Sequence, residues 1–395
     1  MTQPRVAGFV PLAGFYLLYF GALGVTLPFF PAYLKSLGLS GSEVGVLLAL
    51  APLLSLVGPP LWGHLADRTG RADRVLTAVT LGAFACFAPL LWVDRFAALI
   101  VVLASYAFFT SSVTPLIDTL TLQHVGTAGG SFSRVRLFGS IGFVISSTAF
   151  GLAISRIDRM TVLVPLCLMA AYLVWSFLVR ATSAARVAPS VLPGLGLLGD
   201  RQLAIFLGAT SLHWIACSPF HGTFSIHVQA LRLAPPVVGI SAGLGVLAET
   251  CFMYFYPRFA ERLSPQRLLL IAFVSSSVRW FVMSLTSQPE VIVLISSIHG
   301  LTFGAFYVAS IAFVSGRVPS ELRASGQGLF ASATFGLGGL VGYLASGVGY
   351  DALGGHRLFA VAGAVELMAA ALVLKVGTAA ATPTKVTQAV STEAL

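Results

Sequence analysis

Long apolar runs, separated by short polar connections, occupy almost the whole chain. A stretch of about 20 apolar residues forms a helix long enough to cross the hydrocarbon core of a bilayer. The first run continues through Pro28 and Pro31 without a convincing small-residue cleavage site, so we expect a first helix and not a signal peptide. The pattern predicts twelve membrane-spanning helices, over residues 9–33, 43–64, 75–93, 96–122, 133–155, 160–179, 202–229, 236–256, 266–286, 290–314, 325–348 and 358–376.

The composition agrees with this pattern. Of the 395 residues, 57% are hydrophobic and only 9% are charged, and the mean hydropathy is +0.91. A soluble domain carries about 25% charged residues. Twelve spans with their connections account for the length and leave no room for a soluble domain. We therefore expect an all-α membrane protein embedded in a lipid bilayer, which excludes a cytosolic enzyme and a nucleic-acid binder.

The net charge of +9 is distributed unevenly between the two predicted sides of the membrane. With the N-terminus in the cytoplasm, 16 of the 23 Lys and Arg residues fall in cytoplasmic segments and six in external ones. Such a bias sets the orientation of membrane proteins. We expect a multi-pass protein of a bacterial-type inner membrane with both termini in the cytoplasm. The excess charge is then a topology signal and not a surface for an acidic partner.

The longest polar connection separates six spans from six. Short similar segments recur in both groups: Leu65–Arg68 resembles Phe259–Arg262, 194 residues later, and Leu137–Ser140 resembles Leu329–Ser332, 192 residues later. Parallel repeats with a site at the membrane midplane between them are a transporter architecture. We predict two pseudo-symmetric six-helix bundles. The expected divisions are an N-terminal bundle at 1–180, a cytoplasmic linker at 181–201, a C-terminal bundle at 202–377 and a disordered tail at 378–395.

Several ionisable residues lie inside predicted spans. A charge at the bilayer centre costs roughly 2.5 to 3.5 kcal/mol, so each one needs a partner or a water-filled cavity. Asp118 and Arg136 flank the turn between spans four and five symmetrically, so they should lie at similar depth on adjacent helices. Arg279 and His299 flank the turn between spans nine and ten in the same way, which places both near the middle of the membrane. Together with Glu249 they form either functional sites or structural pairs.

The remaining polar residues of the spans carry weaker signals. His213, His221 and His227 share one span but project in different directions, so each is compatible with packing as well as function. Glu366 has no evident partner, and we expect its protonated side chain to make a buried inter-helix hydrogen bond. The cysteines show no metal-like clustering, and we interpret them as buried small hydrophobes. They are Cys86, Cys167, Cys217 and Cys251.

The segment Gly63–Arg71 is the most specific motif of the chain. Taken alone, it is a loop with positive charges on the cytoplasmic side. Its sequence Gly-His-Leu-Ala-Asp-Arg-Thr-Gly-Arg resembles the signature loop of the major facilitator superfamily, between spans two and three. By this resemblance Asp67 faces the N-terminus of span eleven, where the helix dipole favours a carboxylate, and Glu261 does so at span five. The implied gating residues are Gly63, Asp67, Arg68, Gly70, Arg71, Glu261 and Arg262.

Further segments resemble the phenylpropionate permease family and its relative, lactose permease. The segments are Pro28–Pro31, Pro115–Asp118, Ser133–Gly139, Ala248–Glu249, Ser277–Trp280 and Ile298–His299. The chain departs from lactose permease at a proton-carrying carboxylate, a sugar-stacking tryptophan and a sugar-binding asparagine, which are matched here by Thr302, Phe143 and Phe252. These departures argue against a disaccharide site.

The resemblance implies a secondary transporter, and its most concrete form is proton-coupled uptake of a small aromatic organic acid by alternating access. The arginines would supply charge, the histidines polar contacts and the aromatic side chains an apolar wall. Glu249, held by Arg279, would carry the proton, with Asp118 as the next candidate. The expected substrate-binding residues are Asp118, Arg136, Phe143, Tyr19, His221, Arg279, His299 and Phe303, and the expected proton-coupling residues are Glu249, Arg279, His299 and Asp118.

Other functions stay open at this point. They are a nucleoside or sugar proton symporter, an exporter of hydrophobic compounds, and a membrane receptor that transports nothing. The sequence contains no HExxH metal motif, no Ser/His/Asp set and no nucleotide-binding glycine loop, so we expect no enzyme, no ATP-driven pump, no cofactor and no metal. The expected partners are a small-molecule substrate, protons and the bilayer, with no nucleic acid, and we expect a monomer.

Overall fold

The computed structural model describes residues 8–128, 131–181, 192–258 and 262–376. These residues are almost entirely helical, and they contain no strand. The expected tail at 378–395, part of the expected linker and Glu261 lie outside the described residues. The predicted all-α class is therefore confirmed for the part of the chain that the structure describes.

The helices follow the predicted spans closely. In the first half they are α1 (Phe9–Ser36), α2 (Gly41–Ser55), α3 (Gly58–Thr69), α4 (Ala72–Phe87), η1 (Ala88–Leu91), α5 (Phe96–Thr110), α6 (Val113–Ala128), α7 (Phe132–Ala153) and α8 (Met160–Ser176). In the second half they are η2 (Leu192–Gly199), α9 (Arg201–Ala230), α10 (Pro236–Phe255), η3 (Tyr256–Arg258), α11 (Pro265–Leu285), α12 (Pro289–Ser296), η5 (Gly300–Ala305), α13 (Phe306–Arg317), η6 (Ser320–Leu322), α14 (Arg323–Ala331), η7 (Ser332–Gly338) and α15 (Gly339–Val373).

Local sequence signals explain where many of these helices begin. At the start of α2, Ser40 and Glu43 form a capping box in which each side chain binds the backbone N–H of the other. Proline, which has no N–H to leave unpaired, is the first residue of α11 at Pro265 and of α12 at Pro289. Asp200 caps α9 by accepting hydrogen bonds from the first backbone N–H groups. Helix boundaries thus follow from residues that satisfy or avoid free backbone donors.

The Gly63–Arg71 motif is mostly helical, which corrects the expectation of a loop. α3 continues through Thr69 and ends at Gly70, whose φ of 63° is the left-handed conformation typical of a helix C-terminus. Between the prolines at the start of α3 and Gly70 stands a single glycine, Gly63, which a helix tolerates, so the helix extends beyond the apolar run into the polar region. The acidic and basic residues of the motif therefore project from a helix end.

Ten helical runs of the described residues are long and apolar enough to cross a membrane, and α8 is a shorter apolar helix. The run from Arg323 to Val373 contains 51 residues. At 1.5 Å per residue this is about 77 Å of helix, more than twice the thickness of a bilayer core. Its backbone departs from helical geometry at Gly354, between the last two predicted spans. Division of this run at Gly354 agrees with the prediction of twelve crossings, which stays a prediction.

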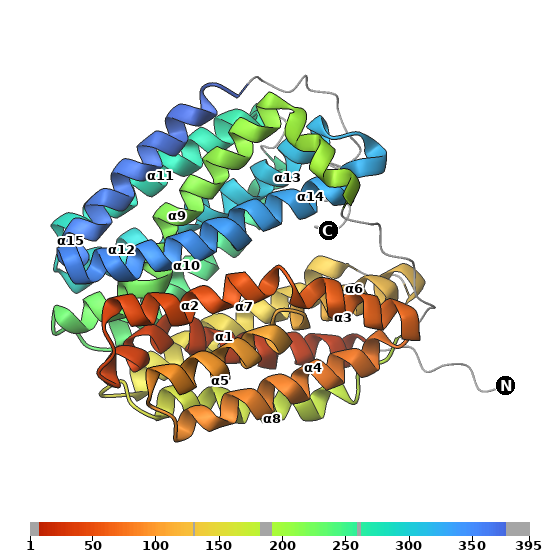
Figure 1. Cartoon of the computed structure of the whole chain (residues 1–395), viewed down its shortest axis with the longest axis horizontal. Coiled ribbons are helices and arrows are strands. Elements are labelled where there is room, and N and C mark those ends of the chain that lie inside the picture. The colour runs from red at the N-terminus through yellow and green to blue at the C-terminus, as the bar shows by residue number, and fades with distance from the viewer. Residues whose placement is uncertain (1–7, 129–130, 182–191, 259–261, 377–395) are drawn as a thin grey trace.

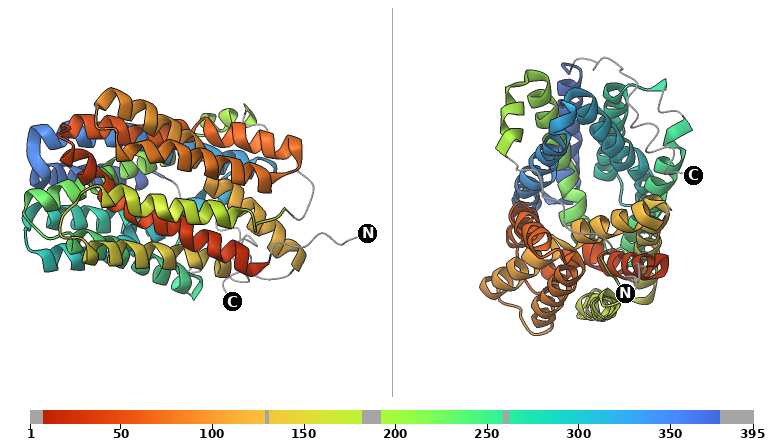
Figure 2. Two further views of the ribbon diagram at one scale, coloured as in Figure 1. Left: turned by 90° about the horizontal axis from the view of Figure 1, so that it is seen from below. Right: turned by 90° about the vertical axis from the view of Figure 1, so that its right-hand side faces the viewer.

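Two helical bundles lie side by side, one formed by α1–α8 and the other by α9–α15 (Figures 1 and 2). Each bundle has large buried aromatic side chains in its interior. Phe15 and Phe87 are fully buried in the first bundle, as are Phe206 and Phe273 in the second. We call these two bundles the N-half and the C-half.

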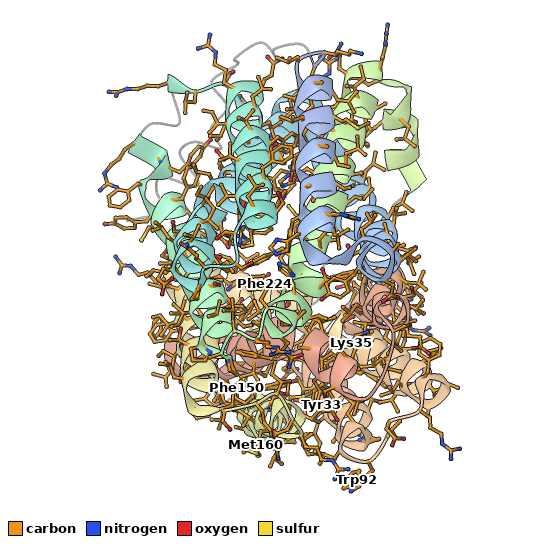
Figure 3. The ribbon with its side chains drawn as sticks, turned by 90° about the vertical axis from the view of Figure 1, so that its left-hand side faces the viewer. Tyr33, Lys35, Trp92, Phe150, Met160 and Phe224 are labelled. Atoms are coloured by element: carbon orange, nitrogen blue, oxygen red, sulfur yellow. The ribbon has the colours of Figure 1, made fainter. Side chains whose placement is uncertain are left out.

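The two halves contact each other closely at one end of the molecule. Gly347 of α15 leaves no room for a Cβ against the backbone of α2, and Gly239 of α10 leaves none against the backbone of α7. Figure 3 looks onto this end, where Phe150 and Phe224 lie near the boundary and Trp92 projects outward. At the opposite end the ribbons of α3 and α14 diverge (Figure 1). The molecule is thus closed at the end predicted to be external.

Candidate functional site

The C-half holds a buried guanidinium group at Arg279, on α11. Its side chain is 1% exposed and lies over the rings of Phe220 and Trp280, 4.2 Å and 4.6 Å from the ring centroids. Its Nη1 donates hydrogen bonds to His299 Nδ1 at 3.2 Å and to Thr302 Oγ1 at 3.3 Å. Among the described residues no carboxylate forms an ion pair with it, and Nε and Nη2 find no acceptor. A full positive charge therefore lies in the protein with free donors.

A pocket surrounds this guanidinium, and we call it the Arg279 pocket. Its walls are largely aromatic: the ring of Phe303 lies parallel to that of His299 at 5.7 Å, and Trp214 lies 5.4 Å from His221. The structure thus brings together four of the predicted site residues. The lining residues are Trp214, Cys217, Phe220, His221, Arg279, Trp280, His299, Thr302 and Phe303.

Glu249 contacts this pocket through a histidine. Its Oε2 lies 3.5 Å from His299 Nε2, and among the described residues no ion pair joins it to Arg279. The imidazole of His299 lies between the two side chains, so the expected link of Glu249 to Arg279 runs through this histidine. The π-helical turn η5 follows His299, and its Gly300 packs against the backbone of Ala248, which brings the two helices together.

The N-half holds a second polar cluster around Tyr16, a residue that no sequence pattern singles out. Tyr16 of α1 donates a hydrogen bond to Asp118 of α6. Arg136 of α7 lies over the ring of Phe20, 3.9 Å from its centroid, and 5.6 Å from the ring of Tyr16. Asp118 and Arg136 thus approach one side chain from adjacent helices, as the hairpin geometry predicts. No ion pair joins them in the described part of the chain.

One tyrosine of the C-half lies near charged residues of both clusters. Tyr307 of α13 is 37% exposed and lies within electrostatic range of Asp118, Arg136 and Glu249. The other predicted wall residues lie elsewhere. Tyr19 is buried in the N-half, where Thr114 donates to its hydroxyl, and the backbone of Phe143 packs against α1. Neither lines the Arg279 pocket.

Glu366 of α15 makes buried inter-helix hydrogen bonds, as we expect, and the structure identifies the partners that the sequence leaves open. Its Oε2 lies 2.9 Å from His213 Nδ1, and its Oε1 accepts hydrogen bonds from Trp280 Nε1 at 3.3 Å and Cys217 Sγ at 3.7 Å. We call these four residues the Glu366 cluster. The partners come from α9 and α11, separated from Glu366 by 86 to 153 residues, so no local pattern could indicate them.

The cysteines also differ from expectation. Cys217 is buried and belongs to the Glu366 cluster, and its thiol and the polar atoms of His213 and Glu366 lie within 4.8 Å of one another. Hydrogen bonds already satisfy both oxygens of Glu366, so the cluster needs no ion to be stable. Cys167 and Cys251 are exposed on the surface of the protein, because they lie on helix faces that no other helix covers.

Two helical bundles in an apolar chain, one of which holds a polar, aromatic-lined pocket, are the form of a membrane transporter. The family described as MFS_1 like matches residues 9–361. The chain belongs to this family. The resemblance to the major facilitator superfamily is thereby confirmed, and the protein is a membrane transporter and not an enzyme.

Known relatives agree with this assignment. The chain is 29% identical over 361 residues, 90% of its length and 94% of the relative's, to a probable 3-phenylpropionic acid transporter of Escherichia coli (strain K12). It is 27% identical over 336 residues, 82% of its length and 83% of the relative's, to the maltose permease of Geobacillus stearothermophilus. A crystal structure of the nucleoside transporter NupG shares the fold with a TM-score of 0.85 and 19% identity, covering 93% of this chain and 98% of that one.

Two of the predicted gating residues of this MFS_1-like transporter, Gly63 and Asp67, make few contacts in the described part of the chain. Among the described residues the side chain of Asp67 makes no hydrogen bond or ion pair, and a Cβ at Gly63 would meet no atom within 4 Å beyond the backbone of its own helix. At the closed end, by contrast, Asp351 of α15 accepts hydrogen bonds of 2.7 Å from the backbone N–H groups of Gly41 and Ser42, at the N-terminus of α2. Sequence reasoning missed Asp351, although it placed the same kind of carboxylate–helix contact at the opposite end.

Proposed function

We propose that this protein takes up a small aromatic organic acid together with a proton, by alternating access between its two halves. The observation that carries the proposal is the guanidinium of Arg279, buried in an aromatic-lined pocket with Nε and Nη2 unpaired. A buried charge without a partner is costly, and a carboxylate matches the fork of guanidinium donors. The substrate would supply that carboxylate.

The residues that line the Arg279 pocket support an aromatic substrate. Phe220, Trp280 and Phe303 offer ring faces but no hydroxyl or amide groups, so an apolar ring fits better than a sugar. A hydroxyl-rich substrate would need several acceptors and donors, because buried polar groups without partners lower affinity. The similarity to a probable 3-phenylpropionic acid transporter supports the same choice.

A nucleoside is the second candidate. The similarity to nucleoside transporter NupG favours it, and the ring faces of the pocket would also stack on a nucleobase. A nucleoside is uncharged, however, and would leave Nε and Nη2 of Arg279 without a charged acceptor. The organic acid is therefore our first choice.

The proposed direction of transport, which is uptake, rests on the predicted orientation of the protein in the membrane. If the sides rich in Arg and Lys are cytoplasmic, the diverging end in Figure 1 opens toward the cytoplasm. The structure would then represent the inward-facing state of a monomer in an inner membrane. Release of the substrate into the cytoplasm would precede closure around Asp67 and opening around Asp351.

Transport by reconstituted protein tests the proposal. Proteoliposomes with a more acidic exterior should accumulate radiolabelled 3-phenylpropionate, and collapse of the pH gradient should abolish accumulation. Uridine and maltose serve as competing substrates under the same conditions. Accumulation of uridine without that of 3-phenylpropionate would favour the nucleoside candidate, and flux independent of the pH gradient would contradict proton coupling.

A further inference from the structure

The Glu366 cluster contains a buried acid–base pair, Glu366 and His213, which lies outside the segments that resemble known permeases. The side chains of Glu366 and His213 are both 0% exposed. The ring of His213 packs against Phe273 at 4.5 Å and Phe306 at 4.4 Å, so apolar groups cover it on the sides of α11 and α13. A carboxyl and an imidazole 2.9 Å apart can share one proton and remain neutral as a pair.

The cluster is joined to the Arg279 pocket by two side chains. Trp280 donates to Glu366 with its indole nitrogen and presents its ring face to Arg279. Cys217 lies 3.7 Å from Glu366 and also lines the pocket. Among the described residues, the ionisable groups in contact with Glu366 are His213 and Cys217 on α9, and Trp280 separates Glu366 from Arg279 on α11. In so buried a region, charges at these positions interact strongly.

Charge balance then links the cluster to the substrate. Without substrate, an ionised Glu366 beside a neutral His213 would offset the charge of Arg279 across Trp280, although it forms no ion pair with the guanidinium and leaves Nε and Nη2 without an acceptor. When a substrate carboxylate binds Arg279, the core gains a negative charge, and one proton added to the pair restores neutrality. In both states the buried core has no net charge, which is the arrangement that costs least in low dielectric.

We propose that the Glu366–His213 pair binds the coupling proton, one proton for each substrate carboxylate held by Arg279. The proton would enter from water on the side from which the substrate enters and leave to water on the other side, past Cys217 and the pocket. The inference rests on the proposed function. It replaces Glu249 as the proton carrier, because the side chain of Glu249 is 20% exposed and water weakens its electrostatic link to Arg279.

Proton uptake on binding tests the proposal. Purified full-length protein in weakly buffered detergent solution receives 3-phenylpropionate, and a pH-sensitive dye records the protons taken up. We expect about one proton per bound anion for the natural protein and none for Glu366→Gln, which still binds the anion. The matched control is Glu290→Gln, at an exposed acid at the start of α12, and it should behave like the natural protein.

Infrared difference spectroscopy provides a second measurement. Its signal would not change on substrate binding if Glu366 had only a structural role. Substrate binding should produce the carbonyl band of a protonated carboxyl group, and this band should be absent in Glu366→Gln. If Glu366→Gln does not fold, Glu366→Asp keeps an acid at this position and should retain the band at a shifted frequency. A band unchanged in the substituted protein would overturn the proposal.

Other outcomes show whether the proton site alone fails or the proposed function fails with it. Undiminished proton uptake by Glu366→Gln would overturn the proton site and leave anion transport intact. Failure of the natural protein to bind any aromatic acid would overturn both. Metal analysis that finds stoichiometric zinc or copper, lost in Cys217→Ser, would show that the cluster binds a metal ion and would also overturn the proposal.

Discussion

The polar clusters of the two halves balance their charges in different ways. In the N-half, Asp118 and Arg136 lie on either side of Tyr16, so an acid and a base of opposite charge are close together. In the C-half, Arg279 has a histidine and a threonine as partners but no carboxylate, and its two remaining nitrogens have no acceptor in the described residues. The difference indicates which half receives an anionic substrate: the half whose positive charge is unpaired.

Substitution of the two arginines should have unequal effects, and this is the largest difference that we expect. Arg279→Gln should weaken the apparent affinity for 3-phenylpropionate roughly 100-fold, about 2.7 kcal/mol, because it removes the only buried cation of the pocket. Arg136→Gln should weaken it roughly tenfold or less, because Asp118 already balances that charge. Initial uptake rates over a range of concentrations measure both, with exposed Arg357→Gln as the control. Equal effects would remove the distinction between the halves.

The N-half cluster depends on a hydroxyl group. Tyr16→Phe removes the hydrogen bond to Asp118 and leaves that carboxylate with less stabilisation in a largely buried site. We expect a loss of about 1 to 3 kcal/mol of stability, seen as a lower melting temperature of the purified protein. Tyr254→Phe, at an exposed tyrosine, should leave the melting temperature unchanged. If Tyr16→Phe also has no effect, Asp118 and Arg136 pair directly in the protein.

The two ends of the molecule can be compared in the same manner. Asp351→Asn weakens the hydrogen bonds to the N-terminus of α2 and should destabilise the closed end by about 1 to 2 kcal/mol. Spin-label distances across that end should then show a larger open population, whereas exposed Asp94→Asn should show none. Asp67→Asn should not change the open population at that end, because the side chain of Asp67 makes no hydrogen bond or ion pair in the described residues. It should slow transport by weakening the opposite closed state.

The smallest effect concerns Asp200, at the start of α9. The hydrogen bond from Arg317 holds the pKa of Asp200 below its ordinary value. A lowered pKa in the folded state stabilises the protein above the pKa of the unfolded chain, near 3.9, and this contribution disappears as the pH falls through the folded value. Asp200→Asn should therefore lower the melting temperature by roughly 1 °C at pH 7, since asparagine still caps the helix. A larger loss would show that the ion pair with Arg317 stabilises the C-half more than expected.

The sequence predicts much of the fold because apolar run length determines helix length in a membrane. It also predicts the approach of Arg279 and His299, 20 residues apart on consecutive helices, because hairpin geometry relates their depths. It does not predict the partners of Glu366, which come from helices that are not consecutive in the chain. It does not predict Tyr16 either, since a tyrosine in an apolar helix looks like any packed aromatic residue.

Electron cryomicroscopy of the protein with bound 3-phenylpropionate tests the assignment of the substrate most directly. We expect the carboxylate of the ligand within hydrogen-bonding distance of Arg279 Nε and Nη2, and its ring against Phe220, Trp280 or Phe303. Ligand density at Arg136, with the nitrogens of Arg279 still unpaired, would contradict the assignment of the anion to the C-half.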